Sequence, residues 1–363
     1  MEFKTTREAL LKALELLRLS SGDPLSPESY QNTVKIEAHK EAIYMFSCCH
    51  SSAMLKKVKG DVKGIGACVV HLVNLLELVK KLVKDKPVKL VILEDGRLEV
   101  RQQRSRFKFS TMDLKGYPAF TYLKKEMYNP INPTDFRDAV AKTSYCIDKD
   151  GVRTSFKGLL IEPVEDKDAE CKLVATDGIR LAIARVLAVF DQQVLIPINC
   201  VEVILKAFKD EKDVGVFADE RFFFFQSEDI YYNSRLLSAE FPDYRKVFPE
   251  GKPTLIKVLR KDMLGALERL NLFSKDTGTL KIQSVGNKLE LRCRDKSVES
   301  LEVVELLPDS QSEPFELGVS TPRILQMFQK FTDSEITMGI YGATLPIHFK
   351  EQNADKFLMP IRI

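Results

Sequence analysis

Apolar residues recur at helical spacing in three stretches of the chain that share one separation. The first stretch, from Thr5 to Leu19, places Leu10, Leu14 and Leu17 on one face of a helix. A second helix is predicted to begin at an Asn-Pro pair near residue 132, and a third begins at residue 260. This regularity over long intervals indicates an internal repeat. The equivalent positions Arg7, Thr134 and Lys261 lie 127 residues apart in both intervals.

A second set of amphipathic segments recurs at nearly the same interval. Helices are predicted at residues 71–81, 199–208 and 321–330, and two strands follow each of them. The Asp-Gly pair at 95–96 predicts a hairpin in the first copy. An aromatic-Pro pair closes each of the first two copies, Tyr117-Pro118 and Phe241-Pro242. The predicted strands are 89–93 and 98–102, 214–218 and 222–226, and 335–341 and 346–350.

These patterns predict an α+β fold built from three copies of one unit, each with two amphipathic helices packed on antiparallel sheets. The period is too long for a solenoid, whose repeats usually span about 20–50 residues. Pro and charged residues cluster near 122–128 and 249–254, so the predicted domains are 1–123, 124–250 and 251–363. Three unrelated α+β domains are the alternative, but they leave the shared spacing unexplained.

Composition is that of an ordinary globular protein. The 363 residues are 44% hydrophobic and include only 17 Gly and 16 Pro, which excludes collagen-like and low-complexity proteins. The first residues are charged where a secretory signal needs an apolar core, and no apolar run is long enough to span a membrane. The seven cysteines are scattered without a C-x-x-C pair, and Cys48-Cys49-His50 is interpreted as strand rather than metal site. We therefore expect a cytoplasmic protein.

Motifs of catalytic and cofactor sites are missing from the sequence. There is no P-loop, no H-E-x-x-H and no G-x-S-x-G, and Gly64-Ile65-Gly66 lacks the third glycine of a dinucleotide fingerprint. The four histidines lie in separate predicted elements, without acidic or cysteine partners at suitable spacing. Asp177 precedes a glycine, as turn residues commonly do. We predict no catalytic residue, no metal and no cofactor.

Basic residues concentrate on the predicted helices, although the whole chain is nearly balanced. Lys and Arg total 55 against 52 Asp and Glu, which by itself argues against a nucleic-acid binder. Cations in a last helical turn also complement the helix dipole, so a solvated face is the simpler interpretation of any one helix. Three copies, however, would present the same face to one surface that suits duplex phosphates without sequence readout. The residues predicted to face DNA are Lys12, Lys80, Lys84, Arg137, Lys142, Lys206, Lys209, Lys261, Arg323 and Lys330.

The last residues, Phe357 to Ile363, are unusually apolar. Terminal segments are commonly polar and frayed, so this composition predicts a tail docked against the body of the protein. The tail is either a final core strand or the wall of an apolar groove that a peptide can share. Met359 and Pro360 would give such a groove an adaptable apolar lining.

Three strings resemble those of the bacterial DNA polymerase III beta subunits, the sliding clamps. They occur in the expected order at residues 173–182 (LVATDGIRLA), 240–249 (EFPDYRKVFP) and 359–363 (MPIRI). Length, triplication and element order agree with that family over the whole chain. The resemblance implies three clamp-type domains and a head-to-tail homodimer that closes into a ring of six domains. Helices would line the central hole, and sheets would form the outside.

The resemblance also implies where the dimer joints and a peptide pocket lie. Phe107 and Phe109 from the first domain would meet Leu272 and Phe273 from the third, although each is equally well interpreted as a core residue. The pocket would lie between the second and third domains. Its implied residues are Phe156, Gly158, Thr176, Gly178, Arg180, Leu181, Pro242, Val247, Thr344, Pro346, Met359, Pro360, Ile361, Arg362 and Ile363.

Three positions of the chain depart from the residues that are common in the family. Ile179 replaces a frequent His, Lys246 replaces a frequent Arg, and Arg323 stands where many members have Tyr. These changes bear on the polarity of the pocket rim and on which peptides it prefers.

By this resemblance the chain is a DNA polymerase processivity factor without catalytic activity of its own. Its implied partners are double-stranded DNA, the alpha-type subunit of the replicative polymerase, an ATP-driven clamp loader, repair polymerases and other proteins with short clamp-binding motifs. Two other classes stay open. One is an enzyme whose site is assembled from separate acids such as Asp177 and Asp243, and the other is an interaction scaffold without a DNA role.

Overall fold

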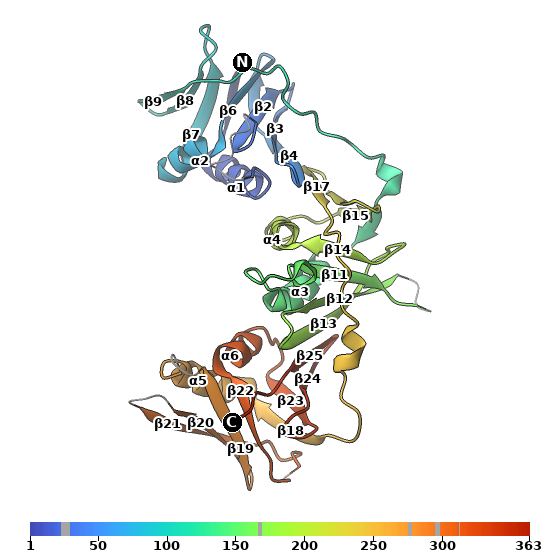
Figure 1. The fold of residues 1–363 in the computed structure, drawn as a ribbon. Coiled ribbons are helices and arrows are strands. Elements are labelled where there is room, and N and C mark those ends of the chain that lie inside the picture. Colours follow the sequence, from blue (N-terminus) through green and yellow to red (C-terminus); the bar gives the residue numbers. More distant parts are fainter. Residues whose placement is uncertain (23–29, 166–168, 275–277, 295–297, 312) are drawn as a thin grey trace. The chain divides into compact units, whose positions relative to one another are not determined.

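The computed structural model of the chain describes residues 1–22, 30–165, 169–274, 278–294, 298–311 and 313–363 (Figure 1). One order of elements recurs three times along these residues. A strand and a helix are followed by a group of strands, a second helix and three more strands. This recurrence is the internal repeat that the spacing predicts, and the α+β class is confirmed.

The first third of the chain shows how the helix ends are fixed. Helix α1 begins after Thr6, whose side chain accepts a hydrogen bond from the backbone N–H of Ala9. The residues predicted as the helix start therefore form the end of a strand and the cap. The elements are β1 (Glu2–Thr6), α1 (Arg7–Arg18), β2 (Thr33–Ala38), β3 (Ala42–Cys48), β4 (Ser52–Lys59), β5 (Asp61–Lys63), β6 (Gly66–His71), α2 (Leu72–Lys81), β7 (Pro87–Ile92), β8 (Leu98–Gln102) and β9 (Ser105–Phe109).

The middle third follows the same order. Asn132 accepts a hydrogen bond from the backbone N–H of Thr134 at 3.0 Å, as its predicted capping role requires. The elements are β10 (Asn129–Ile131), α3 (Pro133–Thr143), β11 (Gly158–Pro163), β12 (Glu170–Thr176), β13 (Arg180–Leu187), β14 (Val194–Pro197), α4 (Ile198–Ala207), β15 (Val214–Ala218), β16 (Phe222–Gln226) and β17 (Ile230–Arg235). Short 3₁₀ turns lie at Ser144–Cys146, Thr154–Phe156 and Tyr244–Val247.

The last third repeats the order again, and its strand β24 begins one residue later than predicted. Pro346 has no N–H to give to a strand ladder, so the pairing starts at Ile347. The elements are β18 (Thr254–Leu259), α5 (Arg260–Asn271), β19 (Thr279–Val285), β20 (Lys288–Arg294), β21 (Glu299–Glu305), β22 (Glu316–Ser320), α6 (Thr321–Gln329), β23 (Glu335–Ile340), β24 (Ile347–Glu351) and β25 (Ala354–Leu358).

The chain forms two compact units, and the boundary between them passes through the middle third. One unit contains residues 1–134 and 199–236, and the other contains residues 135–198 and 237–363. The three-domain division at 123/124 and 250/251 follows the sequence repeat instead, and it stays a prediction.

In the first unit, strands from the first and the middle third of the chain form one sheet. Its eight-stranded sheet has the order β10-β15-β16-β17-β4-β3-β2-β6, and its five-stranded sheet has the order β5-β1-β7-β8-β9. In the larger sheet β17 pairs antiparallel with β4, with Ser234 opposite Ser52. In the smaller sheet β9 is an edge strand.

The second unit is built by the same rule. Its eight-stranded sheet has the order β14-β11-β12-β13-β25-β24-β23-β18, and its four-stranded sheet has the order β21-β20-β19-β22. Here β25 lies beside β13 (Figure 1) and pairs with it antiparallel. Leu358 is opposite Arg180 in this pairing. In the smaller sheet β21 is an edge strand.

In the first and last thirds of the chain, an arginine at the start of the first helix binds the end of the second helix of the same third. Arg7 at the start of α1 donates through Nε to Val79 O at 3.1 Å and through Nη2 to Lys80 O at 2.7 Å. Arg260 at the start of α5 donates in the same way to Phe328 O at 3.3 Å. Val79 O and Phe328 O also accept from the N–H of the C-cap residue of their helix, so the arginines add a second donor where the helical ladder ends. Across the described ranges, none of the helices is long and apolar enough to cross a membrane.

Candidate functional site

The hairpin turn between β12 and β13 is held by its own side chains. Thr176 Oγ1 donates to Arg180 O at 2.8 Å and accepts from Gly178 N at 3.0 Å. Asp177 Oδ1 accepts from the backbone N–H groups of Ile179 and Arg180, at 3.0 and 2.9 Å. Four hydrogen bonds within five residues give this turn a fixed shape before any other segment contacts it.

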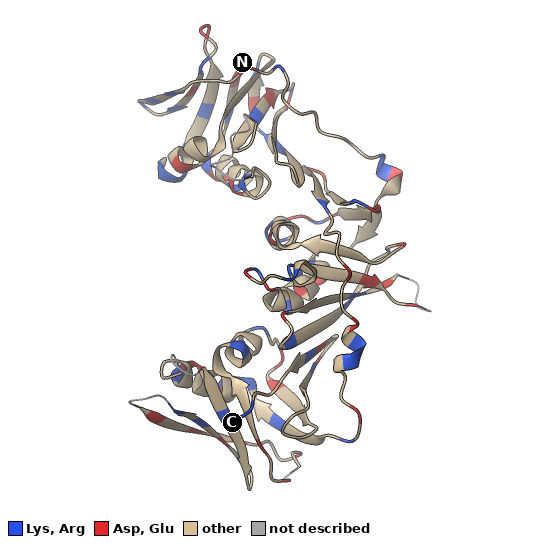
Figure 2. Ribbon diagram, viewed as in Figure 1, with Lys and Arg blue, Asp and Glu red and all other residues tan. Residues whose placement is uncertain are grey.

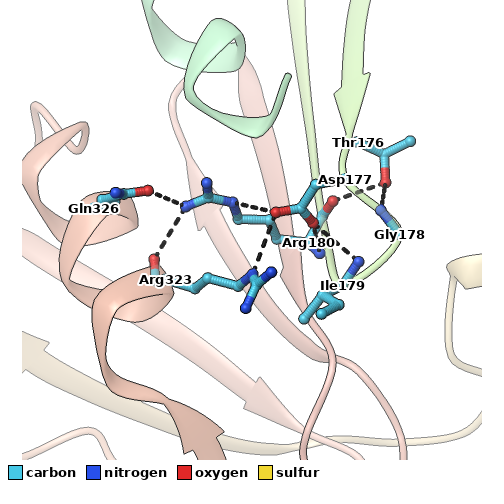
Figure 3. Close-up of polar contacts among 7 residues, drawn as sticks. All are labelled: Thr176, Asp177, Gly178, Ile179, Arg180, Arg323 and Gln326. Carbon is cyan, nitrogen blue, oxygen red and sulfur yellow. Dashed lines mark hydrogen bonds and ion pairs between the residues drawn. The ribbon is translucent and has the colours of Figure 1, made fainter. Parts of the chain in front are cut away.

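The side chain of Arg180 extends from the turn to helix α6 (Figure 3). Its Nε donates to Asp177 Oδ2 at 3.0 Å, and its Nη1 donates to Gln326 Oε1 at 2.7 Å and to Arg323 O at 3.5 Å. Arg323 Nε donates to the same Asp177 oxygen at 3.3 Å. Arg180 also lies over the ring of Tyr145, and burial raises the pKa of that phenol well above its ordinary value. Arg180 and Asp177 are 9% exposed and connect the turn to α6.

Two glycines allow close approaches between chain segments, one in the turn and one at the start of β11. Gly178 has a φ of +84°, and a Cβ there would lie 3.3 Å from the ring of Phe156. Gly158, at the start of β11, would place a Cβ 2.5 Å from Ile196 O. A larger residue at Gly178 would push Phe156 away from the turn, and one at Gly158 would push β14 away from β11.

An apolar floor lies on the sheet beside the turn. The segment after β17 covers it with the half-buried Phe241 and Val247, and the buried Tyr244 donates from its hydroxyl to Glu162 Oε2. Burial raises the pKa of Tyr244, and the Glu162 hydrogen bond raises it further. The ring of Phe248 packs on Phe357, with 4.7 Å between ring centroids. The buried floor residues are Leu160, Val174, Leu181, Ile183, Leu195, Tyr244 and Phe357.

The last residues follow β25 and pack in two places. Met359 N donates to Ile179 O at 2.8 Å, which places Met359 beside the turn. Ile361 N then donates to Gly318 O of β22 at 2.8 Å. A Cβ on Gly318 would lie 2.8 Å from Ile361 O and would collide with the side chain of Ile363. Gly318 therefore leaves room for the docked tail.

The fifteen residues predicted for a pocket all lie in the second unit, on five segments of the chain. Thr176, Gly178 and Arg180 are joined by the hydrogen bonds of the turn, Phe156 lies close to Gly178, and Met359 binds the backbone of Ile179. Thr344 and Pro346 stand just before β24, whose Ile347 is opposite Leu358. Pro242, Thr344 and Arg362 are exposed, whereas Arg180 is turned away from solvent.

Sequence reasoning missed the anchoring residues behind the turn. Asp177 is a turn residue, as predicted, but its carboxylate also binds Arg180 and Arg323. The spacing of Asp177 and Arg180, three residues apart, was the only local signal. Asp243, the other acid considered for catalysis, accepts from Arg245 N at 3.3 Å as a cap of its 3₁₀ turn. In the described part of the chain, no group of three or more His, Cys, Asp or Glu side chains could hold a metal ion.

Comparison with known families decides what this combination of repeat and turn belongs to. A model described as "DNA polymerase III beta subunit, N-terminal domain" matches residues 1–121, and one described as "DNA polymerase III beta subunit, central domain" matches residues 130–243. The chain belongs to the bacterial DNA polymerase III beta subunit family, the beta sliding clamps.

Relatives and solved structures of this family match the chain along its length. A beta sliding clamp of Vibrio cholerae is 23% identical over 374 residues and covers 100% of both chains, and one of Rickettsia bellii is 25% identical over 85% of this chain and 86% of its own. The structure of the Thermotoga maritima beta subunit has a TM-score of 0.89 at 20% identity and covers 100% of this chain and 99% of that chain. The beta subunit of Streptococcus pyogenes also has a TM-score of 0.89, at 16% identity, and covers 100% of both chains.

The basic residues predicted to face DNA have different surroundings. Figure 2 shows that Lys and Arg on the helices are mixed with Asp and Glu. Lys12 pairs with Asp210 at 2.7 Å, and Lys142 is half-buried and donates to Gln352 O at 3.2 Å. Arg137 and Arg323 are also half-buried. The exposed members of the set are Lys12, Lys80, Lys84, Lys206, Lys209, Lys261 and Lys330.

Three of the four residues that the resemblance assigns to dimer joints are exposed. Phe107, on the edge strand β9, is 39% exposed, and Phe109 on the same strand is half-buried. Leu272 and Phe273, directly after α5, are 63% and 40% exposed. Apolar side chains at this exposure do not belong to the core of one chain.

Proposed function

We propose that the chain is a non-catalytic DNA polymerase processivity factor. Two copies close head to tail into a ring that encircles and slides on duplex DNA, and a pocket beside the Thr176–Arg180 turn tethers partner proteins. The observation that carries this proposal is the rule by which strands pair between successive thirds of the chain.

That rule uses the same two strands of the repeat each time. The third strand after the first helix of one copy pairs with the last strand of the next copy, as β4 does with β17 and β13 with β25. The strands that complete the series are β21 of the last copy and β9 of the first, and both are sheet edges. Pairing β21 of one chain with β9 of another would turn the five- and four-stranded sheets into one, and it would remove both exposed edges.

The chemistry of the two edges supports this pairing. Strand β9 presents the cations Arg106 and Lys108, whereas β21 presents the exposed acids Glu299 and Glu305. Complementary charge along two strands favours one partner and one orientation. Apolar contacts would come from Phe107, Leu272 and Phe273, and from Leu301 and Val303, which are each 48% exposed.

A ring of this kind would hold DNA by topology rather than by tight binding. Many strong phosphate contacts would immobilise the protein, because each neutralised phosphate adds to the salt-dependent affinity. Exposed lysines interspersed with acids suit weak and water-mediated contacts instead. In this proposal the protein works in the cytoplasm at the replication fork, where an ATP-driven loader opens the ring.

The pocket would bind short apolar motifs of the alpha-type replicative polymerase subunit, the loader and repair polymerases. The fixed turn and the half-buried Phe241 and Val247, which cover the apolar floor, would provide a preformed site, and this lowers the ordering cost of binding. One or two apolar side chains of a partner would supply most of the affinity, and two pockets per ring would add avidity.

Retention on circular DNA tests the proposed function. With a clamp loader and ATP, the protein should stay on nicked circular plasmid through gel filtration and leave when the plasmid is cut once. Omitting ATP is the control and should prevent loading. Equal retention on circular and linear DNA would contradict a topological link, because a ring slides off free ends.

Gly318→Ala should weaken peptide binding at the pocket without unfolding the protein. The added methyl group collides with Ile363 and crowds Ile361 O, so the tail beside Met359 must shift. We expect a loss of about 10-fold in affinity for an apolar clamp-binding peptide, equivalent to about 1.4 kcal/mol, measured by fluorescence anisotropy.

The matched control for this variant is Gly265→Ala within α5, where the added Cβ lies 3.4 Å from Arg269 Nη1. Helix propensity favours that change, so Gly265→Ala should keep both affinity and stability. Unchanged peptide affinity in Gly318→Ala would show that the tail does not form part of the pocket.

A further inference from the structure

The side chain of Arg323 is held by a hydrogen bond from Nε, and among the described residues its terminal nitrogens make none. Its Nε donates to Asp177 Oδ2 at 3.3 Å, and its side chain is 38% exposed. Figure 3 shows this single bond from the guanidinium, and among the described residues no hydrogen bond is made by its two terminal nitrogens. The anchor fixes the position of a guanidinium whose two parallel N–H groups are left for another acceptor.

The local charge around Arg323 is not balanced. Asp177 is the one carboxylate that both Arg180 and Arg323 contact, and Gln326, the other side chain on Arg180, is neutral. Two cations therefore share one anion next to the turn. A further cation on a pocket segment is the exposed Arg362, whereas Lys246 is paired with Asp243, with 3.7 Å between Nζ and Oδ2. The surplus of positive charge favours a ligand that brings a carboxylate.

We propose that Arg323 is a specificity-determining residue that binds a carboxylate of the docked partner segment. The segment would place apolar side chains against the half-buried Phe241 and Val247, which cover the floor, and an Asp or Glu at the terminal nitrogens of Arg323. This inference rests on the proposed pocket, because it concerns which peptides that pocket prefers.

The geometry of the guanidinium explains why a carboxylate fits better than an amide or a hydroxyl. Two parallel N–H donors match the two oxygens of a carboxylate, which gives a bidentate and charge-assisted contact. Part of the ordering cost is already met, because Asp177 holds the side chain in place. Lysine at this position would keep the charge and lose the fork, so the two residues are not equivalent here.

A peptide series tests the inference directly. Fluorescently labelled apolar peptides that differ at a single flanking position, Asp, Asn or Lys, are titrated with the full-length protein at low and high salt. We expect the Asp peptide to bind about 5-fold more tightly than the Asn peptide at low salt, which is a typical strength for a partly exposed ion pair. The Lys peptide should bind most weakly, and the differences should shrink as salt rises.

The variants Arg323→Gln and Arg323→Lys locate the effect. The measured quantity is the ratio of the Asp to the Asn peptide affinity within each variant, so a general loss of binding cancels. The ratio should fall to about one in Arg323→Gln and take an intermediate value in Arg323→Lys. The matched control Lys350→Gln removes an exposed cation from β24 in the same unit and should keep the wild-type ratio.

The outcomes separate this inference from the pocket itself. If none of the peptides binds the wild-type protein, the proposed pocket is wrong and the inference falls with it. If the peptides bind but the Asp and Asn forms are equal, the pocket stands and the role of Arg323 is rejected. An Asp preference that survives Arg323→Gln would also reject it and would point to another cation.

Discussion

The double variant Phe107→Asp and Leu272→Asp is expected to be a monomer that no longer stays on circular DNA. These side chains are 39% and 63% exposed in the single chain, and the proposed ring buries both. A carboxylate left without a partner at an apolar joint costs several kcal/mol, so we expect the dimer dissociation constant to rise by at least about 100-fold. Sedimentation velocity would measure the mass, and plasmid retention would measure the function.

Ile65→Asp is the matched control, because Ile65 is 83% exposed and lies outside both edge strands. It should remain dimeric and load normally. If the double variant were still a dimer at micromolar concentration, β9 and the end of α5 would not form the joint. The rule that pairs β21 with β9 would then fail for the third junction.

The helices and hairpins were predictable because local patterns determine them. The six helices begin within about two residues of the predicted starts, and the strands Leu98–Gln102, Val214–Ala218 and Phe222–Gln226 have their predicted bounds. Apolar spacing fixes which face of each helix is buried, and capping residues such as Thr6 and Asn132 fix where it begins. The family models confirm the family that the three sequence strings indicate.

The long-range arrangement was not predictable from local patterns. Pairing of β4 with β17 joins residues almost two hundred positions apart, and nothing in either strand specifies its partner. The direction of Arg180 is a similar case. The resemblance implies only that Arg180 belongs to the pocket, whereas the structure shows its guanidinium bound by Asp177 and Gln326 and directed toward α6. A sequence string gives the residue and not the rotamer, so the anchoring contacts appear only in three dimensions.

The two strand pairings between successive thirds, β4 with β17 and β13 with β25, share a backbone arrangement but differ in one side chain. Arg235 N donates to Ser51 O at 2.7 Å in the first unit, just as Met359 N donates to Ile179 O at 2.8 Å in the second. The first residue of β4 is Ser52, whereas the first residue of β13 is Arg180. The backbone framework is therefore shared. Only the second junction has a side chain long enough to link the hairpin to the following helix.

The second unit also contains a buried ion pair whose loss should strongly destabilise the protein. Lys356 Nζ lies 2.7 Å from Glu351 Oε2, and both side chains are 0% exposed. Lys356 also donates to Lys330 O at 3.2 Å and lies over the ring of Phe331, while Glu351 Oε1 accepts two hydrogen bonds of 2.6 Å from Thr332. Lys356→Met leaves the buried carboxylate with only the more distant Lys142, whose Nζ lies 3.8 Å from Glu351 Oε1. We expect the free energy of unfolding to fall by about 3–5 kcal/mol in urea titrations at pH 7.

The double variant Lys356→Met and Glu351→Gln is the informative control, because it removes both charges and keeps an acceptor for Thr332. It should be more stable than Lys356→Met alone.

Burial alone would raise the pKa of Glu351, but Lys356 and Thr332 outweigh it and hold that pKa below its ordinary value. Because the folded-state pKa is depressed, this stabilisation is complete above the unfolded-state pKa, about 4.3, and is lost as the pH falls through the folded-state pKa. Glu351→Gln should therefore flatten the acid side of the stability profile. If Lys356→Met cost less than about 1 kcal/mol, or if the double variant were the less stable of the two, the pair would not be a structural element of this unit.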